Sequence, residues 1–337
     1  MRERVLLTGS AGFIGFHLCK NLLSQGYKVV GIDNINHYYD PKLKNIRLKN
    51  IDNFVNKNKL ESSYSFFNID ISDGNKLREL FLENDFQIVI NLAAQAGVRY
   101  SLKNPNAYIS SNLVGFSNVI ECCREFMIKH LIFASSSSVY GMNTNQPFSE
   151  NDNTDFPISL YAATKKSNEL LAHSYSHLYK IPCTGLRFFT VYGPYGRPDM
   201  AYYSFTKSID EEIPIDVFNN GEMMRDFTYI DDIVIGISEV VKRVPCSITR
   251  ATTNAEAPFR IFNIGNNNPV SLKRFIEAIE NTLSKKAIKN MLPMQKGDVP
   301  ITYADINNIT SEYGFKPTTS IEEGIRKFVE WYLEAKI

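Results

Sequence analysis

Through the first half of the chain, short runs of apolar residues alternate with segments in which apolar residues recur at helical spacing. The apolar runs predict buried strands at residues 5–8, 29–33, 65–68, 88–91, 130–135 and 184–189. Apolar positions at helical spacing predict helices at about 13–24, 73–84, 106–128 and 159–179. This alternation is typical of an α/β fold built on a doubly wound parallel sheet. The Asn- and Lys-rich segment 36–60 is predicted to form a helix and a loop at the rim of a pocket.

The pattern changes after about residue 187. Shorter elements and turn residues follow, among them the segment 265–269, and they predict a smaller lobe. We therefore expect a larger domain over residues 1–187 and a lobe over 188–337, with the chain returning to the first sheet near 260–265. A chain of 337 residues is long enough for both parts.

Charge and cysteine content narrow the classes of function. Lys and Arg number 37 against 36 Asp and Glu, which gives no broad attraction for nucleic acid or an anionic membrane. The five cysteines have no metal-ligand spacing, and adjacent Cys122 and Cys123 are interpreted as packing residues. No apolar run approaches the roughly 20 residues that span a bilayer. With an odd cysteine count and no secretory signal, we expect a cytoplasmic protein.

A glycine-rich turn follows the first predicted strand. Gly9, Gly12 and Gly15 are spaced three residues apart, and Phe13 and Ile14 begin the next helix. This G-x-x-G-x-x-G spacing is a variant of the dinucleotide fingerprint. It places backbone N–H groups at a helix N-terminus, where they can hold a pyrophosphate.

The second predicted strand ends at Asp33. A carboxylate at this position can accept hydrogen bonds from an adenosine ribose and would repel a 2′-phosphate, which favours NAD. The alternative is a tight turn followed by an unrelated surface acid.

Tyr161 and Lys165 stand four residues apart in a predicted helix, so both side chains can point to one side of it. A nearby ammonium lowers the pKa of a phenol and allows it to act as a base. A serine run ending at Ser138 can add a hydroxyl from a strand end. Taken alone, the Tyr–Lys pair could also lie on a solvated helix face.

Further motifs lie in the expected order along the chain. They occupy residues 31–41, 91–101, 135–141, 186–194, 196–200 and 297–300. Together with the glycine turn and the Tyr–Lys pair, they resemble the extended short-chain dehydrogenase/reductase family. Within that family the chain is most similar to nucleotide-sugar epimerases, and among these to UDP-glucuronate 4-epimerases. The resemblance implies a Rossmann-type domain with a smaller C-terminal substrate-binding lobe.

The implied reaction interconverts UDP-glucuronate and UDP-galacturonate. Tyr161 takes the proton of the C4 hydroxyl, hydride passes to NAD, and the 4-keto sugar turns over before it is reduced on its other face. Lys165 lowers the phenol pKa, and Ser136 hydrogen-bonds the reacting oxygen. NAD is regenerated in each cycle, so no external reductant is needed.

The resemblance also implies sets of binding residues. The cofactor set is Gly9, Gly12, Phe13, Ile14, Gly15, Asp33, Asn34, Asp70, Ile71, Leu92, Ala93, Ala94, Tyr161 and Lys165. The substrate set is Ser137, Ser138, Thr190, Arg197, Arg225, Asp298 and Arg99. Arg99 and Arg197 could instead be surface residues, and Ser138 could simply end a polar strand. Gln295 stands where the family often has an arginine that contacts phosphate. Asp231 and Asp232 are interpreted as the N-cap and first turn of a helix.

The sugar itself is inferred from a few positions. Related dehydratases and decarboxylases carry acids at the positions of Ser137 or Ser138, whereas Thr190 and Arg197 suit a uronate carboxylate. We hypothesise that this clamp keeps the carboxylate out of the alignment that would release CO₂ from the 4-keto sugar. Alternatives are a 4-epimerase of UDP-N-acetylglucosamine or UDP-glucose, a UDP-glucuronate decarboxylase, and a non-enzymatic NAD-sensing protein. By family analogy we expect a homodimer formed through helices 106–128 and 159–179.

Overall fold

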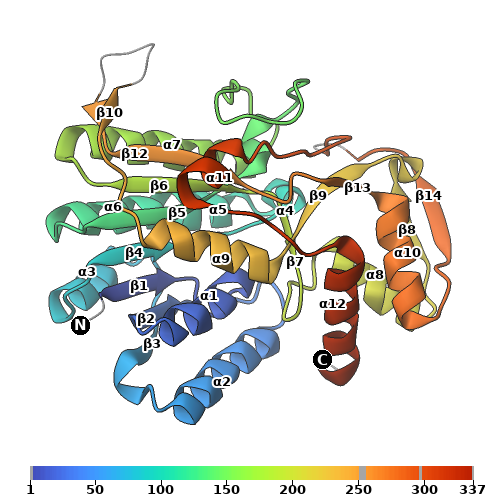
Figure 1. Cartoon of the computed structure of the whole chain (residues 1–337), viewed down its shortest axis with the longest axis horizontal. Helices are drawn as coiled ribbons and strands as arrows, with labels where there is room; N and C mark the ends of the chain where they lie inside the picture. Colours follow the sequence, from blue (N-terminus) through green and yellow to red (C-terminus); the bar gives the residue numbers. More distant parts are fainter. Residues whose placement is uncertain (1–2, 250–255, 296–297, 336–337) are drawn as a thin grey trace. The chain divides into compact units, whose positions relative to one another are not determined.

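The computed structural model describes residues 3–249, 256–295 and 298–335 (Figure 1). The described residues form two compact units. The first unit comprises Met1–Met142, Asn153–Arg187 and Gly236–Phe262, and the second comprises Asn143–Asp152, Phe188–Ile235 and Asn263–Ile337. The chain therefore passes between the two units more than once.

A seven-stranded sheet carries the core of the first unit, in the order β12-β6-β5-β4-β1-β2-β3. Its strands are β1 (Arg4–Thr8), β2 (Lys28–Asp33), β3 (Tyr64–Asn68), β4 (Ile88–Asn91), β5 (His130–Ser136), β6 (Cys183–Phe188) and β12 (Phe259–Ile264). β1 pairs in parallel with β2 and β4, and the β2–β3 and β4–β5 pairs are also parallel. This order confirms the predicted doubly wound α/β fold, and the six predicted strands are present as β1 to β6.

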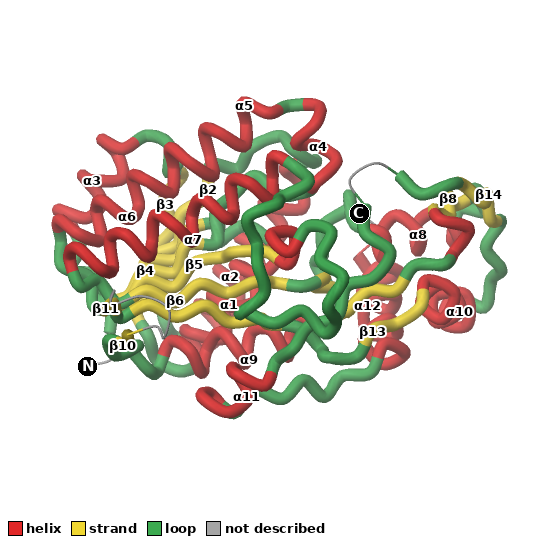
Figure 2. Tube along the Cα trace, turned by 90° about the horizontal axis from the view of Figure 1, so that it is seen from above, coloured by secondary structure: helices red, strands yellow, loops and turns green. Residues whose placement is uncertain are grey.

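Helices cover both faces of this sheet. They are α1 (Phe13–Ser24), α2 (Pro41–Asn58), α3 (Gly74–Glu83), α4 (Val98–Lys103), α5 (Pro105–Tyr108), the π-helical turn η2 (Ile109–Val114), α6 (Gly115–Glu125) and α7 (Leu160–Tyr179). The short elements η1 (Glu61–Ser63), η3 (Ser137–Tyr140), β10 (Ile248–Thr249) and β11 (Glu256–Ala257) complete the unit. Figure 2 shows α3, α6 and α7 on one face of the sheet and α1 on the other, as right-handed crossovers require.

The prediction of a single helix over 106–128 is wrong in detail, because the structure divides this range into α5, η2 and α6. The buried Asn112 side chain lies at the break. Its amide donates to the Gln95 carbonyl and the Thr164 hydroxyl, both at 3.0 Å. Both contacts join residues that are distant in the sequence, and π-helical turns are rare and occur mostly as single turns within α-helices, frequently at functional sites. The helix expected within segment 36–60 is present as α2, with Asp40 as its N-cap.

The second unit contains two small sheets and four helices of its own among the described residues. One sheet has the order β13-β9-β7, with β13 (Pro269–Ser271), β9 (Met224–Tyr229) and β7 (Thr190–Tyr192); the other pairs β14 (Lys289–Leu292) with β8 (Ile215–Phe218). The helices are α8 (Ala201–Asp210), α10 (Leu272–Leu283), α11 (Asn307–Tyr313) and α12 (Ile321–Ala335), and η4 (Asn219–Gly221) is a single turn. Helix α9 (Ile230–Val241) runs across the division between the units. Stacking of Phe227 on Phe275, with ring centroids 4.5 Å apart, joins β9 to α10.

Four of the five cysteines are buried: Cys19, Cys122, Cys123 and Cys183. Burial raises the pKa of each of these thiols, that of Cys122 to about 12, which fits a packing role. Cys246 is exposed. Among the residues that the structure describes, no helix combines the length and apolar character needed to cross a bilayer.

Candidate active site

The carboxyl ends of β1, β2, β4 and β5 meet at one edge of the sheet in the first unit. They end at Thr8, Asp33, Asn91 and Ser136. β1 lies between β2 and β4, so the strand order reverses there. In such sheets ligands bind outside the carboxyl ends of the strands at this switch point.

The turn after β1 requires glycine for both conformation and space. Gly9 has φ +71°, and a Cβ built on it would lie 2.8 Å from the Ala93 backbone nitrogen. A Cβ on Gly15 would lie 2.2 Å from the Gly9 carbonyl oxygen. The turn therefore packs tightly on the residues after β4, and it leads directly into α1, which begins at Phe13. The N-terminus of α1 is thus presented at the sheet edge, as an anion site requires.

The predicted adenosine-side residues form a hydrogen-bonded group at the ends of β2 and β3. The Asn34 amide donates to an Asp70 carboxylate oxygen at 2.7 Å, and the Ser72 backbone and hydroxyl donate to the other oxygen. Although burial opposes ionisation, these hydrogen bonds hold the pKa of Asp70 below its usual value. Asp33 is buried at the end of β2, and Ile71 is buried beside Gly115.

Helix α7 places the Tyr161 and Lys165 side chains one turn apart. Ser159 caps this helix by accepting a hydrogen bond from the Ala162 backbone at 3.1 Å. Tyr161 is half-buried, and its ring contacts Tyr108 edge to face with centroids 6.0 Å apart. The Lys165 ammonium is buried and donates to the Ala134 carbonyl at 2.8 Å. This bond holds the lysine beside the end of β5, two residues before Ser136.

Burial lowers the pKa of Lys165 to about 8. Removing an ammonium from water disfavours its charged form, and this burial is the cause of the shift. A lysine in this state is still mostly charged at neutral pH and loses its proton about one pH unit higher. Such perturbation at a strand edge is typical of functional groups.

The serine run begins in β5 and continues into η3. The Ser136 hydroxyl accepts a hydrogen bond from the Ser138 backbone at 3.2 Å, which turns the chain at the strand end. Ser136 is buried, whereas Ser137 and Ser138 are half-buried. The serines therefore differ in exposure, and Ser136 is the one fixed within the turn.

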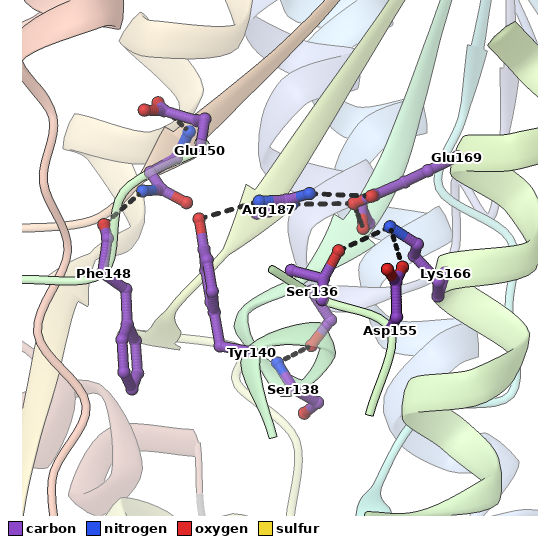
Figure 3. A network of polar contacts seen from close by, with 12 residues as sticks. Ser136, Ser138, Tyr140, Phe148, Glu150, Asp155, Lys166, Glu169 and Arg187 are labelled. Atoms are coloured by element: carbon purple, nitrogen blue, oxygen red, sulfur yellow. Dashed lines mark hydrogen bonds and ion pairs between the residues drawn. The ribbon is translucent and has the colours of Figure 1, made fainter. Parts of the chain in front are cut away.

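A buried ion pair that the sequence analysis missed lies behind this turn. Figure 3 shows the Arg187 guanidinium between the Glu169 carboxylate and the Tyr140 hydroxyl. Arg187 donates to both Glu169 oxygens, at 2.8 and 2.9 Å, and to Tyr140 at 3.0 Å. Ser135 also donates to Glu169, at 2.6 Å. The pair ties β5, β6, η3 and α7 together. The spacing of Tyr161, Lys165 and Glu169, each four residues after the last, was the signal that could have located it.

The other predicted site residues of the first unit differ from one another in solvent exposure. Leu92, Ala93 and Ala94 are half-buried after β4, and the Ala93 backbone donates to the Thr8 hydroxyl at 3.0 Å. Arg99 is exposed on α4. Among the described residues, no cluster of His, Cys, Asp and Glu has the arrangement of a metal site.

Thr190, Arg197, Arg225 and Asp298 belong to the second unit. The Arg197 guanidinium donates to both oxygens of Asp199, at 3.0 and 2.5 Å, and its backbone donates to the buried Tyr202 hydroxyl. Arg225 donates to the carbonyls of Met224 and Pro300, at 2.9 and 3.2 Å. Thr190 and Asp298 are half-buried. Gly297, in the motif of Asp298, lies outside the described residues.

The interpretation of Asp231 as an N-cap is wrong. Helix α9 begins at Ile230, so Asp231 and Asp232 both lie in its first turn. Asp232 accepts hydrogen bonds from the backbones of Thr318 and Thr319 and thereby links α9 to the segment before α12. Its role is structural, as predicted.

Comparison with known families matches residues 6–328 to the family described as GDP-mannose 4,6 dehydratase. The chain belongs to this family. It is 54% identical over 338 residues to protein CapI of Staphylococcus aureus, covering 98% of each chain. It is 47% identical to a probable UDP-glucuronate 4-epimerase of Rhizobium meliloti, covering 98% of this chain and 96% of the relative.

A solved member of the family has the same fold. The UDP-glucuronic acid 4-epimerase of Bacillus cereus, in complex with UDP-glucuronic acid and NAD, superimposes with a TM-score of 0.87 at 33% identity, covering 98% of this chain and 99% of that one. The predicted extended short-chain dehydrogenase/reductase family, with its nucleotide-sugar epimerases and dehydratases, is confirmed.

Proposed function

We propose that the protein is an NAD-dependent nucleotide-sugar 4-epimerase that interconverts UDP-glucuronate and UDP-galacturonate. The observation that carries the proposal is the buried Lys165 ammonium, one helical turn from Tyr161 and bonded to the strand that ends in Ser136. The similarity to UDP-glucuronate 4-epimerases supports the choice of sugar.

Two features of the first unit fit NAD. A Cβ on Gly9, Gly12 or Gly15 would collide with the backbone of the turn itself or of the residues after β4, so the turn keeps the tight form of a dinucleotide-binding turn only with glycine at these positions. The N-terminus of α1, at Phe13 and Ile14, offers backbone N–H groups. The remaining proposed contacts are Asp33, Asn34, Asp70, Ile71, Leu92, Ala93, Ala94, Tyr161 and Lys165. When bound, NAD supplies the hydride acceptor and, later in the same cycle, the hydride donor.

The chain's own residues would manage the proton and the orientation of the sugar. The Tyr161 phenolate accepts the proton of the C4 hydroxyl and returns it when the ketone is reduced again. The Lys165 ammonium stabilises that phenolate, because an adjacent positive charge favours the ionised form of a phenol. The Ser136 hydroxyl donates a hydrogen bond to the reacting oxygen.

The proposed substrate residues divide into two groups by their chemistry. Ser137, Ser138, Thr190 and Arg197 would bind the uronate carboxylate through hydroxyls and a guanidinium. Arg225 and Asp298 would bind the diphosphate and the uridine ribose, respectively. Arg99, exposed on α4, is a further candidate cation for the substrate.

One observation favours a second candidate, a 4-epimerase of UDP-glucose or UDP-N-acetylglucosamine. Both oxygens of Asp199 already accept hydrogen bonds from the Arg197 guanidinium. A positive charge that is paired within the chain attracts a uronate less strongly than an unpaired one. A neutral hexose would then compete better for the site.

Incubation of the purified protein with UDP-glucuronate, without reductant and followed by ¹H NMR, tests the proposal. Appearance of UDP-galacturonate without loss of CO₂ would support it. Formation of UDP-xylose or a 4-keto pentose would show that the protein is a decarboxylase and not an epimerase. Turnover of UDP-glucose or UDP-N-acetylglucosamine alone would favour the second candidate, and bound NAD without any turnover would favour a sensing protein. Tyr161→Phe is the control, with an expected loss of about 10²–10⁴-fold in rate.

We also propose that the protein is a cytoplasmic homodimer. A groove of about 630 Å³ lies between η2, α6 and α7, with the apolar residues Leu113, Val114, Leu170 and Leu171 in its lining. Val114 and Leu170 are 47% and 60% exposed. The same helices of a second copy would cover these side chains, which a monomer would leave in water.

A further inference from the structure

Helix α2 places two cations inside the first unit, where charged side chains are rarely fully buried. Lys44 and Arg47 lie three residues apart on this helix, and both are buried. The Arg47 guanidinium donates to the Ala11 carbonyl at 2.9 Å and to the Tyr39 hydroxyl at 2.6 Å. Ala11 lies within the glycine turn, so this helix supports one side of the proposed dinucleotide site.

Lys44 contacts the residue of that site that is expected to meet the adenosine ribose. Its ammonium donates to the Asn36 side-chain oxygen at 3.0 Å and lies 3.5 Å from the Asp33 carboxylate. Both side chains of the Lys44–Asp33 pair are only 7% exposed. Burial lowers the pKa of Lys44, while the Asp33 carboxylate opposes that shift. The carboxylate expected to meet the adenosine ribose is therefore already paired with a cation.

The loop between these residues holds the pair in one arrangement. The Asp33 carboxylate accepts a hydrogen bond from the Ile35 backbone at 2.8 Å, and the Asn36 side chain accepts one from Tyr38. Ile35 has φ +47°, a conformation that a β-branched residue adopts only when its surroundings impose it. Lys44 bonds both ends of the strained stretch, since it contacts Asp33 and Asn36.

This arrangement changes the argument for selectivity between NAD and NADP. An acid at the end of β2 binds a ribose diol, whereas a cation nearby can accept a 2′-phosphate. In this chain the acid (Asp33) and the cation (Lys44) form one ion pair, so the Asp33 charge neutralises the Lys44 charge. We propose that Lys44 is a specificity-determining residue: it positions Asp33 for NAD and becomes a 2′-phosphate ligand when the Asp33 charge is removed. The inference rests on the proposed use of a nicotinamide dinucleotide, and not on the identity of the sugar.

The test measures which dinucleotide each variant retains. Purified protein is incubated with equal concentrations of NAD and NADP, passed through a desalting column and denatured, and the released nucleotides are quantified by chromatography. Asp33→Asn is expected to raise the ratio of NADP to NAD by about tenfold or more, the scale of one charge-assisted hydrogen bond. The double variant Asp33→Asn/Lys44→Gln is expected to lose that gain. Lys44→Gln alone is expected to retain NAD about tenfold less tightly, because Asp33 loses its partner.

Lys49→Gln is the matched control, since Lys49 is exposed on the same helix and should leave both ratios unchanged. If Lys44→Gln does not fold, Lys44→Arg replaces it, and this variant should preserve the NADP gain in the Asp33→Asn background. Two results would overturn the inference about Lys44 while leaving the proposed NAD dependence intact. One is an NADP gain that survives in Asp33→Asn/Lys44→Gln, and the other is the absence of an NADP gain in Asp33→Asn. Retention of neither dinucleotide by the wild type overturns the proposed NAD dependence and this inference with it.

Discussion

At the scale of single residues, Lys165 connects burial with the proposed chemistry. Its ammonium is enclosed beside β5, and burial lowers its pKa to about 8. The sequence predicted Tyr161 and Lys165 as a pair because their spacing is local. It could not predict that Lys44, Arg47, Glu169 and Arg187 are buried with partners, because the enclosing groups come from distant parts of the chain. Charged residues are on average exposed, so the sequence pattern alone argues against such positions.

The pKa of Lys165 sets the expected pH dependence. Below about pH 8 the side chain is charged and favours the Tyr161 phenolate, whereas above that pH it loses its proton. We therefore expect kcat to fall as pH rises through about 8. Lys165→Arg keeps its charge, since guanidinium titrates above about pH 12, and should move the fall to higher pH. Rates across pH, with the melting temperature of both proteins as control, would check this. A fall at the same pH in Lys165→Arg would contradict it.

The Arg197 side chain gives a second prediction at this scale. If it restrains the uronate carboxylate, Arg197→Ala should release several-fold more UDP-4-keto-pentose per epimerisation event than the wild type, because the carboxylate can then reach the geometry for CO₂ loss. Product ratios by ¹H NMR measure this. Arg78→Ala, at an exposed arginine on α3 that is likewise paired with a carboxylate, is the comparison variant. If no variant of Arg197, Thr190 or Ser138 releases more UDP-4-keto-pentose than the wild type, the clamp hypothesis is wrong.

At the scale of elements, the strands were predicted better than the helices that join them. Five of these strands (β1, β2, β4, β5 and β6) are almost entirely buried and appear in the sequence as short apolar runs, whereas β3, at the edge of the sheet, is partly exposed. The break between α5 and α6 was not predictable, since it depends on the contacts of Asn112 with Gln95 and Thr164. The second unit gave a weak sequence signal because its strands are short: β7 and β13 have three residues each.

The Glu169–Arg187 pair and its hydrogen bonds join β5, β6, η3 and α7, so the loss of this pair should destabilise the protein. Arg187→Met leaves the Glu169 carboxylate buried without its partner, and we expect a loss of about 3–5 kcal/mol in the free energy of unfolding. Urea denaturation measures it. Arg78→Met breaks an exposed pair with Glu125 and should cost at most about 1 kcal/mol. Equal effects of the two substitutions would mean that the buried pair contributes little.

At the scale of the whole molecule, the groove between η2, α6 and α7 predicts self-association. Leu170→Glu places a charge among apolar side chains that a second copy would bury, and we expect it to shift the protein from dimer to monomer. Light scattering after size-exclusion chromatography measures the mass. Leu82→Glu, an equally exposed leucine on α3, is the control and should not change it. A wild type that is already monomeric would refute the proposed dimer.

The distribution of thiols has a practical consequence for studying the protein in solution. Cys246 is exposed, while the other four cysteines are enclosed and their pKa values are raised. Because thiolates are the reactive form, a maleimide dye added to the folded protein should attach at this one position. Mass spectrometry of tryptic peptides would verify the stoichiometry. The wild-type chain thus carries its own attachment point for a fluorescent reporter or for a surface, without any engineered substitution.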